Sequence, residues 1–371
     1  MTQEQLSKYQ EELISELEND VKKILEDIST PSPSHILYHY TSFNNFSTRI
    51  IKNREFCYTD FRHLNDPTEV ILSTEVLLKA IKGRRGENDK LQEIFWQPFL
   101  DTFPAILKPE NFEKVRHNFR LIDKIESNIY TLSFCQKTDY LPMWRWYGDD
   151  GRGISIGLKP AYFASHPVVE GDRSPRPVYT DVLYDENKFV SAVNRISDAA
   201  EHKMKKLIEF CKKKNVSADG FQEIATSFAR VLHNRLVSYL LPLMPAFKHQ
   251  GYQDENEHRL YYLECKVTYK PEDNKPSTFF PFDEIPAERR GIKYRKPVEG
   301  ICLPYIEHKI PFVRSDKFSL EDIAEIWVGP CVHFDCAREQ IIKLLVEAGY
   351  AISKIDTEEG IKIKKSQAPY R

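Results

Sequence analysis

The feature that most constrains the fold is a long amphipathic pattern at the N-terminus. Over residues 2–28, apolar residues recur at steps of three and four, and Glu and Lys fill most other positions. This period predicts one helix with a single apolar stripe. The stripe consists of Leu6, Tyr9, Leu13, Leu17, Val21, Ile24 and Ile28. Pro31 and Pro33 end the helix. This apolar stripe must be buried, either against the core of this chain or against a second copy. Residues 1–30 are therefore predicted to serve in packing or in assembly, and in the second case residues 2–28 would form the contact surface of a homo-oligomer.

The rest of the chain combines short strand patterns with blocks of helix. The expected helical segments are one starting near Thr41 or Ser42, a helical middle over 69–127, two helices within 185–240, and one over 336–348. The expected strands are 36–40, 128–135, 152–158, 257–265, 351–356 and 361–366. Helical blocks between widely separated strands favour an α+β fold. We predict one α+β domain over residues 36–371, with a helical insertion at about 185–240.

Composition narrows the classes of partner. Lys plus Arg (53) nearly balances Asp plus Glu (55), so the formal charge of -2 gives no global attraction to nucleic acid. No stretch reaches the roughly 20 apolar residues of a membrane span, which predicts no membrane partner and a cytoplasmic location. The seven cysteines form no CxxC pair and are expected to be reduced thiols. The stretch "CVHFDC" lacks a second pair of ligands, so no metal site is predicted.

The first candidate site is the stretch "LYHYTSFNNF". In a strand, His39 and Thr41 face one side and Tyr40 faces the other. The helix that follows begins with unpaired N–H groups, and Asn45 adds an amide. Such donors beside a histidine suit phosphate or ribose hydroxyls. The alternative is a core histidine bonded to a backbone carbonyl.

Two further stretches concentrate polar and aromatic side chains. In "YTDFRHLNDPTE", helix capping explains "NDPTE" but not Arg62, which is either a bidentate clamp for a pyrophosphate or a solvated loop residue. In "SFCQKTDYLPMWRWYGDDGRG", Ser133 lies on a strand just before a group of large aromatic side chains that includes Trp144 and Tyr147. These rings either stack on a planar ligand ring or seal a corner of the core.

The last candidate stretch, "DENEHRLYY", places acidic residues just before a strand. If the strand begins at Glu257, then Glu257, Arg259 and Tyr261 share one face. At the edge of a cleft, Glu255 or Glu257 would serve as a base or an electrostatic stabiliser. On a solvated turn, the same carboxylates would have no function.

Taken in order, these motifs resemble a known family. The motifs are "LYHYTS", "LNDPTE", "LSFC", "LPMWRWYGDDGRGISIGL", "DENEHRL", "IAEIWVGP" and "SQAPYR". Their order and spacing over about Ile36 to Arg371 resemble the bacterial domain of unknown function family 2971 (DUF2971). The family name carries no activity.

A second, more distant resemblance implies a chemistry. The stretch "LYHYTSFNNF" resembles the first strand and helix of DNA-modifying ADP-ribosyltransferase toxins of the DarT type, in a His-x-Thr pattern with an Asn six residues after the His. The resemblance implies an ADP-ribosyltransferase-like split β-sheet core with NAD as the substrate. His39 would contact a ribose hydroxyl, Thr41 would lie on the nicotinamide side, and Asn45 would lie nearby. An arginine would meet the phosphates, with Arg62 the first choice and Arg54 the second.

The same resemblance implies a catalytic carboxylate. Broader transferases of this fold use a serine on the second strand and a late glutamate, which correspond here to Ser133 and Glu257, with Glu255 in reserve. Cleavage of the bond to nicotinamide develops oxocarbenium character, which a nearby carboxylate stabilises. One aromatic side chain would flank the departing ring: Tyr40, Trp144 or Tyr147.

The expected function is therefore that of an NAD-dependent ADP-ribosyltransferase-like effector of the toxin or antiviral defence type. It would cleave the nicotinamide–ribose bond and transfer ADP-ribose to nucleic acid, protein or water, and an antitoxin or regulatory partner is expected. The alternative is a non-catalytic nucleotide-binding or assembly module of a defence or toxin–antitoxin system. A metal-dependent hydrolase using His39, Asp60, His63 and Asp66 ranks last, because their spacing fits no standard site.

Overall fold

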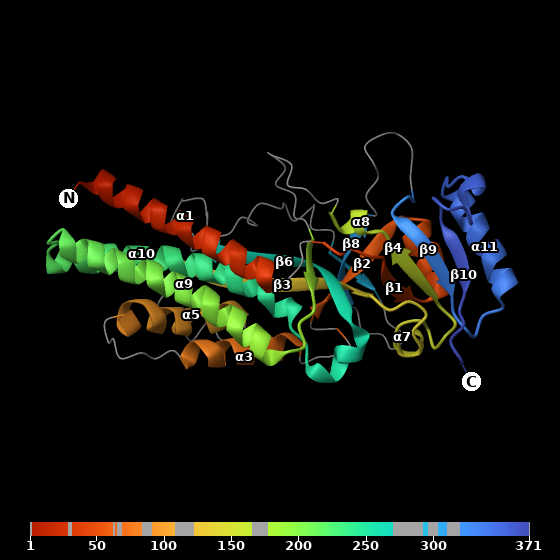
Figure 1. Cartoon of the computed structure of the whole chain (residues 1–371), viewed down its shortest axis with the longest axis horizontal. Coiled ribbons are helices and arrows are strands. Elements are labelled where there is room, and N and C mark those ends of the chain that lie inside the picture. The colour runs from red at the N-terminus through yellow and green to blue at the C-terminus, as the bar shows by residue number, and fades with distance from the viewer. Residues whose placement is uncertain are drawn as a thin grey trace.

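A computed structural model describes most of the chain. The described residues are 2–28, 32–61, 64, 69–83, 91–107, 122–164, 177–269, 292–295, 303–309 and 320–370. The helices α1, α9 and α10 run side by side at one end of an elongated molecule, and a sheet with α11 forms the other end (Figure 1). This is a mixed α+β architecture, as predicted from the sequence. No helix in the described ranges is both long and apolar enough to cross a membrane.

The helical end is built around three long helices. Its described members are α1 (Gln3–Ile28), α3 (Glu69–Lys82), the π-helix η3 (Gln92–Trp96), α5 (Gln97–Leu107), α9 (Glu186–Lys213) and α10 (Ala218–Leu240). Asp185 and Ser217 cap α9 and α10 with their side chains. The predicted N-terminal helix and the two helices within 185–240 are confirmed.

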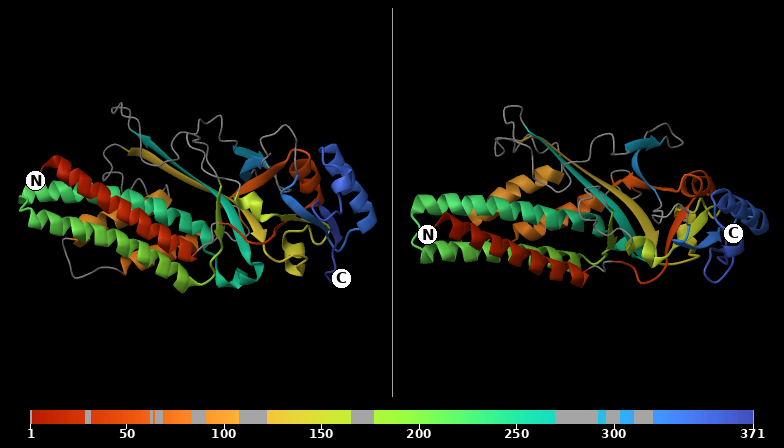
Figure 2. Two further views of the ribbon diagram at one scale, coloured as in Figure 1. Left: turned by 45° about the horizontal axis from the view of Figure 1, so that its top comes forward. Right: turned by 90° about the horizontal axis from the view of Figure 1, so that it is seen from above.

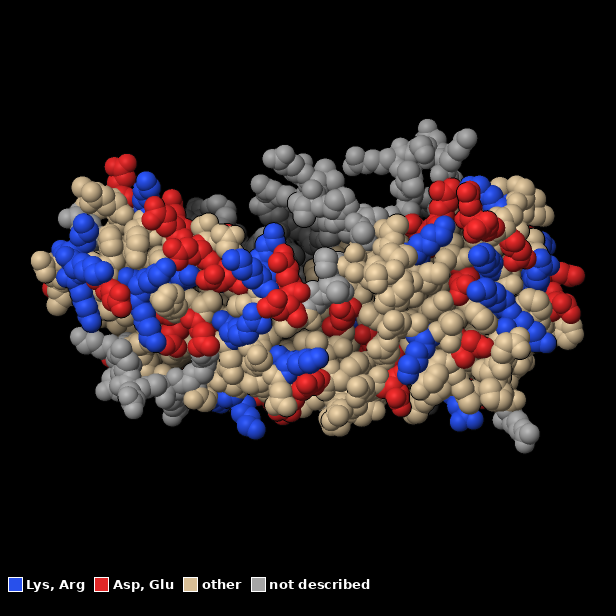
Figure 3. Space-filling model, viewed as in Figure 1, with Lys and Arg blue, Asp and Glu red and all other residues tan. Residues whose placement is uncertain are grey.

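The apolar stripe of α1 is covered by this chain. Leu13, Leu17 and Val21 are buried in one core with residues of α9 and α10, and the three helices lie together in both views of Figure 2. Opposite charges also join α1 to α9, where the buried Lys203 contacts Asp20 at 2.8 Å and Glu16 at 3.1 Å. Figure 3 shows this mixture of basic and acidic side chains over α1 and α9. The middle of the stripe is therefore buried by this chain's own helices, whereas Leu6, Tyr9 and Ile28 are only partly buried.

The other end is a mixed sheet. The described strands are β1 (Leu37–Thr41), β2 (Glu55–Asp60), β3 (Ile122–Cys135), β4 (Ile154–Leu158), β5 (Val178–Asp181), β6 (Glu257–Tyr269), β7 (Ile292–Arg295), β8 (Leu303–Lys309), β9 (Ile323–Val328) and β10 (Lys362–Lys365). Their order is β10-β9-β4-β1-β3-β2-β8-β7, with β6 on the other edge of β3 and β5 beyond it. Only β9 and β10 pair in parallel among these strands. Helix α11 (Phe334–Glu347) packs against this sheet through Ala337, Ile341 and Leu345.

The long strand β3 organises the sheet. One edge pairs with β6 from Ile122 to Cys135. The other edge is shared, because β2 pairs with Tyr130 and Thr131 whereas β1 pairs with Cys135. Within the described strands, residues 132–134 therefore have no ladder partner on this edge. The separation of β1 from β2 at this point makes room for a cavity.

Two sequence predictions of secondary structure are wrong. The helical middle was expected to reach residue 127, but β3 begins at Ile122, because pairing with β6 supplies its backbone hydrogen bonds. Residues 351–356 were expected to form a strand, but they contain a short 3₁₀ helix (Ile352–Lys354) with exposed side chains. The edge beside β9 is instead taken by β10. The strand predicted to begin at Glu257 does begin there.

Candidate functional site

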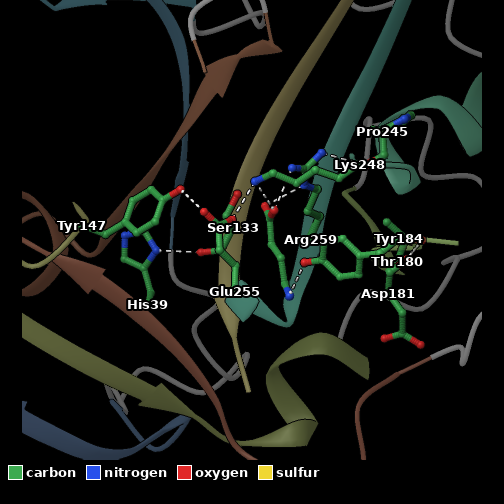
Figure 4. Close-up of polar contacts among 11 residues, drawn as sticks. His39, Ser133, Tyr147, Thr180, Asp181, Tyr184, Pro245, Lys248, Glu255 and Arg259 are labelled. Carbon is green, nitrogen blue, oxygen red and sulfur yellow. Dashed lines mark hydrogen bonds and ion pairs between the residues drawn. The ribbon is translucent and has the colours of Figure 1, made fainter. Parts of the chain in front are cut away.

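A cavity of about 510 Å³ opens where β1 and β2 separate from each other along one edge of β3. Its walls come from segments far apart in the sequence: β1 with the helical turn after it, β2, β3, helix α7 (Leu141–Trp146), and the stretch from Lys248 to Arg259. The lining includes most of the residues that the sequence singled out, namely His39, Tyr40, Thr41, Asn45, Ser133, Tyr147, Glu255 and Glu257. Figure 4 shows how several of these side chains converge on β3 and β6.

His39 has a defined protonation state. Its Nδ1 lies 3.0 Å from the carbonyl oxygen of Ser133, which can only accept, so Nδ1 carries the proton. Burial lowers the pKa of the imidazole and outweighs the opposing effect of this hydrogen bond, so the ring is neutral near pH 7. The rings of Phe56 and Phe134 pack around it. His39 is therefore both a core histidine bonded to a carbonyl and a cavity residue, and its Nε2 lone pair can accept a hydrogen bond.

The turn after β1 adds polar groups to the same wall. The side chain of Ser42 accepts from the backbone N–H of Asn45 and caps α2 (Phe43–Asn45), which continues as the π-helix η1 (Phe46–Ile51). The amide of Asn45 donates to the hydroxyl of Thr41 at 2.8 Å. Arg49 follows one turn later, lines the cavity and contacts the sulfur of Cys57 at 3.2 Å. A cation thus lies on the wall that holds Thr41 and Asn45.

Two carboxylates and two cations form the opposite wall. Both oxygens of Glu257 accept from Arg259, at 2.6 and 2.8 Å, and the ammonium of Lys248 lies 3.0 Å from Oε2. Lys248 also contacts Glu255 at 2.6 Å. Burial alone would raise the pKa of Glu257, but the charges of Arg259 and Lys248 together lower it, so the carboxylate is ionised. The four side chains carry two positive and two negative charges, and their net charge is zero.

The backbone explains why both carboxylates face the same cavity. A 3₁₀ helix, η6 (Gln250–Glu255), ends at Asn256, whose φ of 44° lies in the left-handed region. Asparagine tolerates this conformation better than most residues. The strand β6 then starts at Glu257, whose N–H donates to the hydroxyl of Tyr184 at 2.9 Å. The sharp turn at Asn256 brings Glu255 and Glu257 to one side.

The two carboxylates differ in access. The side chain of Glu255 is 20% exposed and that of Glu257 is 5% exposed. Glu255 accepts from the hydroxyl of Tyr147 at 3.0 Å and from Lys248. Glu257 already accepts from three nitrogen donors, and the hydroxyl of Ser133 also lowers its pKa. A further hydroxyl can therefore reach Glu255 more easily than Glu257.

The aromatic residues divide between cavity and core. Tyr147 lines the cavity, and Trp146, which the sequence analysis did not select, is 75% exposed at its rim. Trp144 is completely buried, donates to Asp139 at 2.8 Å and meets the ring of Tyr40 edge-on. Trp144 does not line the cavity, and its packing fits the alternative of a sealed core corner.

The arginines expected for phosphate binding are elsewhere or undescribed. Arg62 lies outside the described residues, as do His63 and Asp66. Arg54 is buried, and its guanidinium donates to the carbonyl of Ala348, so it does not line the cavity. Among the described residues no group of three His, Cys, Asp or Glu side chains is arranged to hold a metal ion.

Sequence reasoning missed three cavity cations: Arg49, Lys248 and Arg259 were given no role. The position of Arg49, four residues after Asn45 in a helical segment, was a usable signal, because such residues lie on one face. Lys248 carried no comparable signal, since its contacts with the two glutamates depend on the fold of the turn between them.

Comparison with known proteins finds a family that matches one part of the chain, and this part supplies several of the cavity residues. Residues 143–260 match the family described as "Protein of unknown function (DUF2971)". Over this stretch, about a third of the chain, the sequence is similar to that family. The family predicted from the sequence is thereby confirmed, although the motif resemblance spans more of the chain. The DUF2971 stretch supplies Tyr147, Lys248, Glu255, Glu257 and Arg259, whereas His39 and the turn after it precede the stretch. No curated protein and no solved structure matches the chain.

Proposed function

We propose that the cavity binds NAD and that the protein is an ADP-ribosyltransferase-like effector of the toxin or antiphage type. One observation carries the proposal: His39, Thr41 and Asn45 line the same cavity as Glu255 and Glu257, although about two hundred residues separate the two groups. A volume of about 510 Å³ lies within the range of small-molecule sites. The split-sheet core of ADP-ribosyltransferases is part of this proposal.

The first wall would hold the dinucleotide. The Nε2 lone pair of neutral His39 accepts a hydrogen bond from a ribose hydroxyl. Arg49 takes the role of the phosphate contact, because a guanidinium can pair with phosphate oxygens through two parallel hydrogen bonds. Thr41 and Asn45 lie between these two groups in the sequence and offer a hydroxyl and an amide. Tyr147 would flank the departing nicotinamide ring.

The second wall would stabilise the reacting ribose. The bond between the ribose carbon and the nicotinamide nitrogen breaks, and nicotinamide leaves with the electron pair. A hydroxyl or amine of the acceptor, or water, then forms the new bond to that carbon and loses a proton. We assign Glu255 to the positive charge that develops on the ribose, because its side chain is the more exposed of the two carboxylates. Glu257 would hold Lys248 and Arg259 in place.

A second candidate function is binding without turnover. Lys248 contacts both carboxylates, so the wall that would stabilise a cation is neutral as a whole. A site of this kind could hold NAD or ADP-ribose without breaking a bond, as expected for a nucleotide-binding module. The two functions are distinguished by whether the protein, once it is shown to bind NAD, also cleaves it.

The test is release of nicotinamide from NAD by the purified chain, measured with water, an oligonucleotide mixture or a protein extract as the acceptor. We expect release by the unchanged protein and a loss of at least about 100-fold in Glu255→Gln. Glu339→Gln, an exposed site on α11, is the matched control and should keep full activity. Equal release by Glu255→Gln and Glu339→Gln would contradict the assignment of Glu255.

Calorimetry with ADP-ribose separates the two candidate functions. If the protein releases no nicotinamide under any condition but binds ADP-ribose, and His39→Ala abolishes that binding, the binding module is the correct function. If neither NAD nor ADP-ribose binds, both functions are wrong.

A further inference from the structure

The end of the chain lies against the segment that surrounds α7. Residues 366–370, called the C-terminal tail below, follow β10 and belong to the motif "SQAPYR". The backbone N–H of Ser366 donates to the carbonyl of Val328 at 3.0 Å, at the end of β9. None of the tail residues lines the cavity, but α7 carries Trp146 at its rim and leads directly into Tyr147. The tail therefore contacts a cavity wall from behind.

Asp139 joins the tail to the start of α7. Its carboxylate accepts from the indole N–H of Trp144 at 2.8 Å, from the backbone N–H of Gln367 at 2.6 Å, and from the hydroxyl of Ser366. The φ of Asp139 is 46°, in the left-handed region that aspartate tolerates better than most residues. Donors from two distant segments thus converge on one side chain, which fixes the tail and α7 relative to each other.

The tail also contacts the far end of α7. The hydroxyl of Tyr370 donates to Asp150, in the turn after the helix. The guanidinium of Arg145 lies 5.5 Å from the centre of the Tyr370 ring, within the range of a cation–π contact. Between these two ends, Ala368 packs against the buried cluster that contains Trp144. The tail therefore spans α7 from its start to the turn that follows it.

Helix α7 depends on such contacts because it is short. It has six residues, and a helix of this length has little stability of its own. The backbone N–H of Tyr147 donates to the carbonyl of Met143 at 2.9 Å, so Tyr147 follows any movement of the helix. The hydroxyl of Tyr147 donates to Glu255 at 3.0 Å inside the cavity. A displacement of α7 would therefore move Tyr147 relative to Glu255.

We propose that the C-terminal tail holds α7 through Asp139 and thereby sets the position of Tyr147 in the cavity. Asp139 does not line the cavity, so it is a positioning residue that acts through Trp144 and the helix. The identity of the ligand rests on the proposed function, in which Tyr147 flanks the nicotinamide ring, whereas the link between tail and helix rests on the contacts alone. The tail should therefore affect the binding of a ligand with nicotinamide more than that of ADP-ribose, which lacks this ring.

The first measurement is hydrogen exchange of the full chain, followed by mass spectrometry. Asp139→Asn keeps the size of the side chain but turns an amide NH₂ group toward donors that need an acceptor. Asp149→Asn is the matched control, because it makes the same substitution at an exposed residue of the turn after α7 that also has a left-handed φ, of 50°. We expect the amides of residues 141–147 to exchange at least about fivefold faster in Asp139→Asn than in the control, and those of α10 to exchange equally.

A second variant approaches the same link from the tail. Ser366→Ala removes the hydroxyl that donates to Asp139 and that accepts from the backbone N–H of Ala368 at 3.1 Å. It should speed the exchange of residues 141–147 in the same direction. This variant decides the question if Asp139→Asn does not fold.

The second measurement is calorimetry with ADP-ribose and with carba-NAD, an analogue whose bond to nicotinamide resists cleavage. Asp139→Asn should raise the Kd for carba-NAD about two- to tenfold through the misplaced aromatic ring, with one ligand still bound per chain. Its Kd for ADP-ribose should stay within about twofold of that of Asp149→Asn. A purely structural role would instead lower the number of ligands bound per chain and leave both Kd values unchanged.

The outcomes separate this proposal from the proposed function. Equal exchange of residues 141–147 in Asp139→Asn and Asp149→Asn would overturn the link between tail and helix. Faster exchange with an unchanged Kd for carba-NAD, or an equal rise in both Kd values, would overturn the role of the tail in placing Tyr147. If the unchanged protein binds neither ligand, the proposed function is wrong, and the exchange rates still decide whether the tail holds α7.

Discussion

Replacement of Arg259 by methionine tests the buried charge cluster of the cavity. Arg259 is 1% exposed, donates twice to Glu257 and once to the carbonyl of Pro245. Methionine fills similar space but removes all of these donors. Among the described residues, Glu257 then keeps only Lys248 as a charged partner.

The size of the effect follows from burial. Breaking a buried ion pair by removing one partner costs about 3–5 kcal/mol, because the other charge stays buried without compensation. Exposed pairs contribute at most about 1 kcal/mol. Arg195 pairs with Asp27 at 2.6 Å, but both side chains are about half exposed. We therefore expect Arg259→Met to lower the free energy of unfolding by about 3–5 kcal/mol, and Arg195→Met by less than about 1 kcal/mol.

The assay is urea unfolding at pH 7, followed by circular dichroism and tryptophan fluorescence. The double variant Arg259→Met with Glu257→Leu should lose less stability than the sum of the two single variants, because neither charge of the pair remains. The reasoning is refuted if Arg259→Met costs no more than Arg195→Met, or if the two single effects simply add.

The same cluster predicts a dependence on pH. The pKa of Glu257 is lower in the folded protein than its ordinary value of 4.5. The unfolded chain therefore takes up the proton first as the pH falls. The stabilisation by Glu257 is present above pH 4.5 and is lost as the pH falls through the lower pKa of the folded state. Urea unfolding at several pH values should show a smaller loss of stability on acidification in Glu257→Leu than in the unchanged protein.

Two further predictions test the helical core and the cysteines. Leu17→Ala, at a fully buried position of α1, should lower the free energy of unfolding by about 2–5 kcal/mol in urea. Ile352→Ala, at a 66% exposed position, should change it by less than about 0.5 kcal/mol, and equal effects would contradict the packing of α1 against its own chain. Cys331 and Cys336 are exposed and should react with Ellman's reagent in the native protein. Burial raises the pKa of Cys135 to about 12. Peptide mapping should therefore find Cys135 modified only after unfolding. Rapid labelling of Cys135 in the native protein would contradict its buried position.

Sequence patterns predicted the elements whose signals are local. The period of three and four residues predicted α1, and the side chain of Ser42 caps the helix expected after β1. The alternation of side chains along a strand predicted that Glu257 and Arg259 share one face, and the two side chains do make contact. In each case the residues that set the structure are within a few positions of one another.

Features that depend on distant segments were not predictable in this way. The polar first half of β3 forms a strand because β6 pairs with it. Trp144 and Tyr147 were equivalent in the sequence, but the packing of α7 buries the first and leaves the second in the cavity. The neutralisation of both carboxylates by Lys248 likewise requires the turn at Asn256. Tertiary contacts determine each of these outcomes.

The most direct test of the central claim is a crystal structure of the protein soaked with NAD. The account predicts density for NAD or its cleavage products in the cavity, with a ribose hydroxyl within hydrogen-bond distance of His39 and the scissile ribose beside Glu255. Well-ordered NAD bound elsewhere, or an open cavity that stays free of nucleotide at saturating NAD, would contradict it.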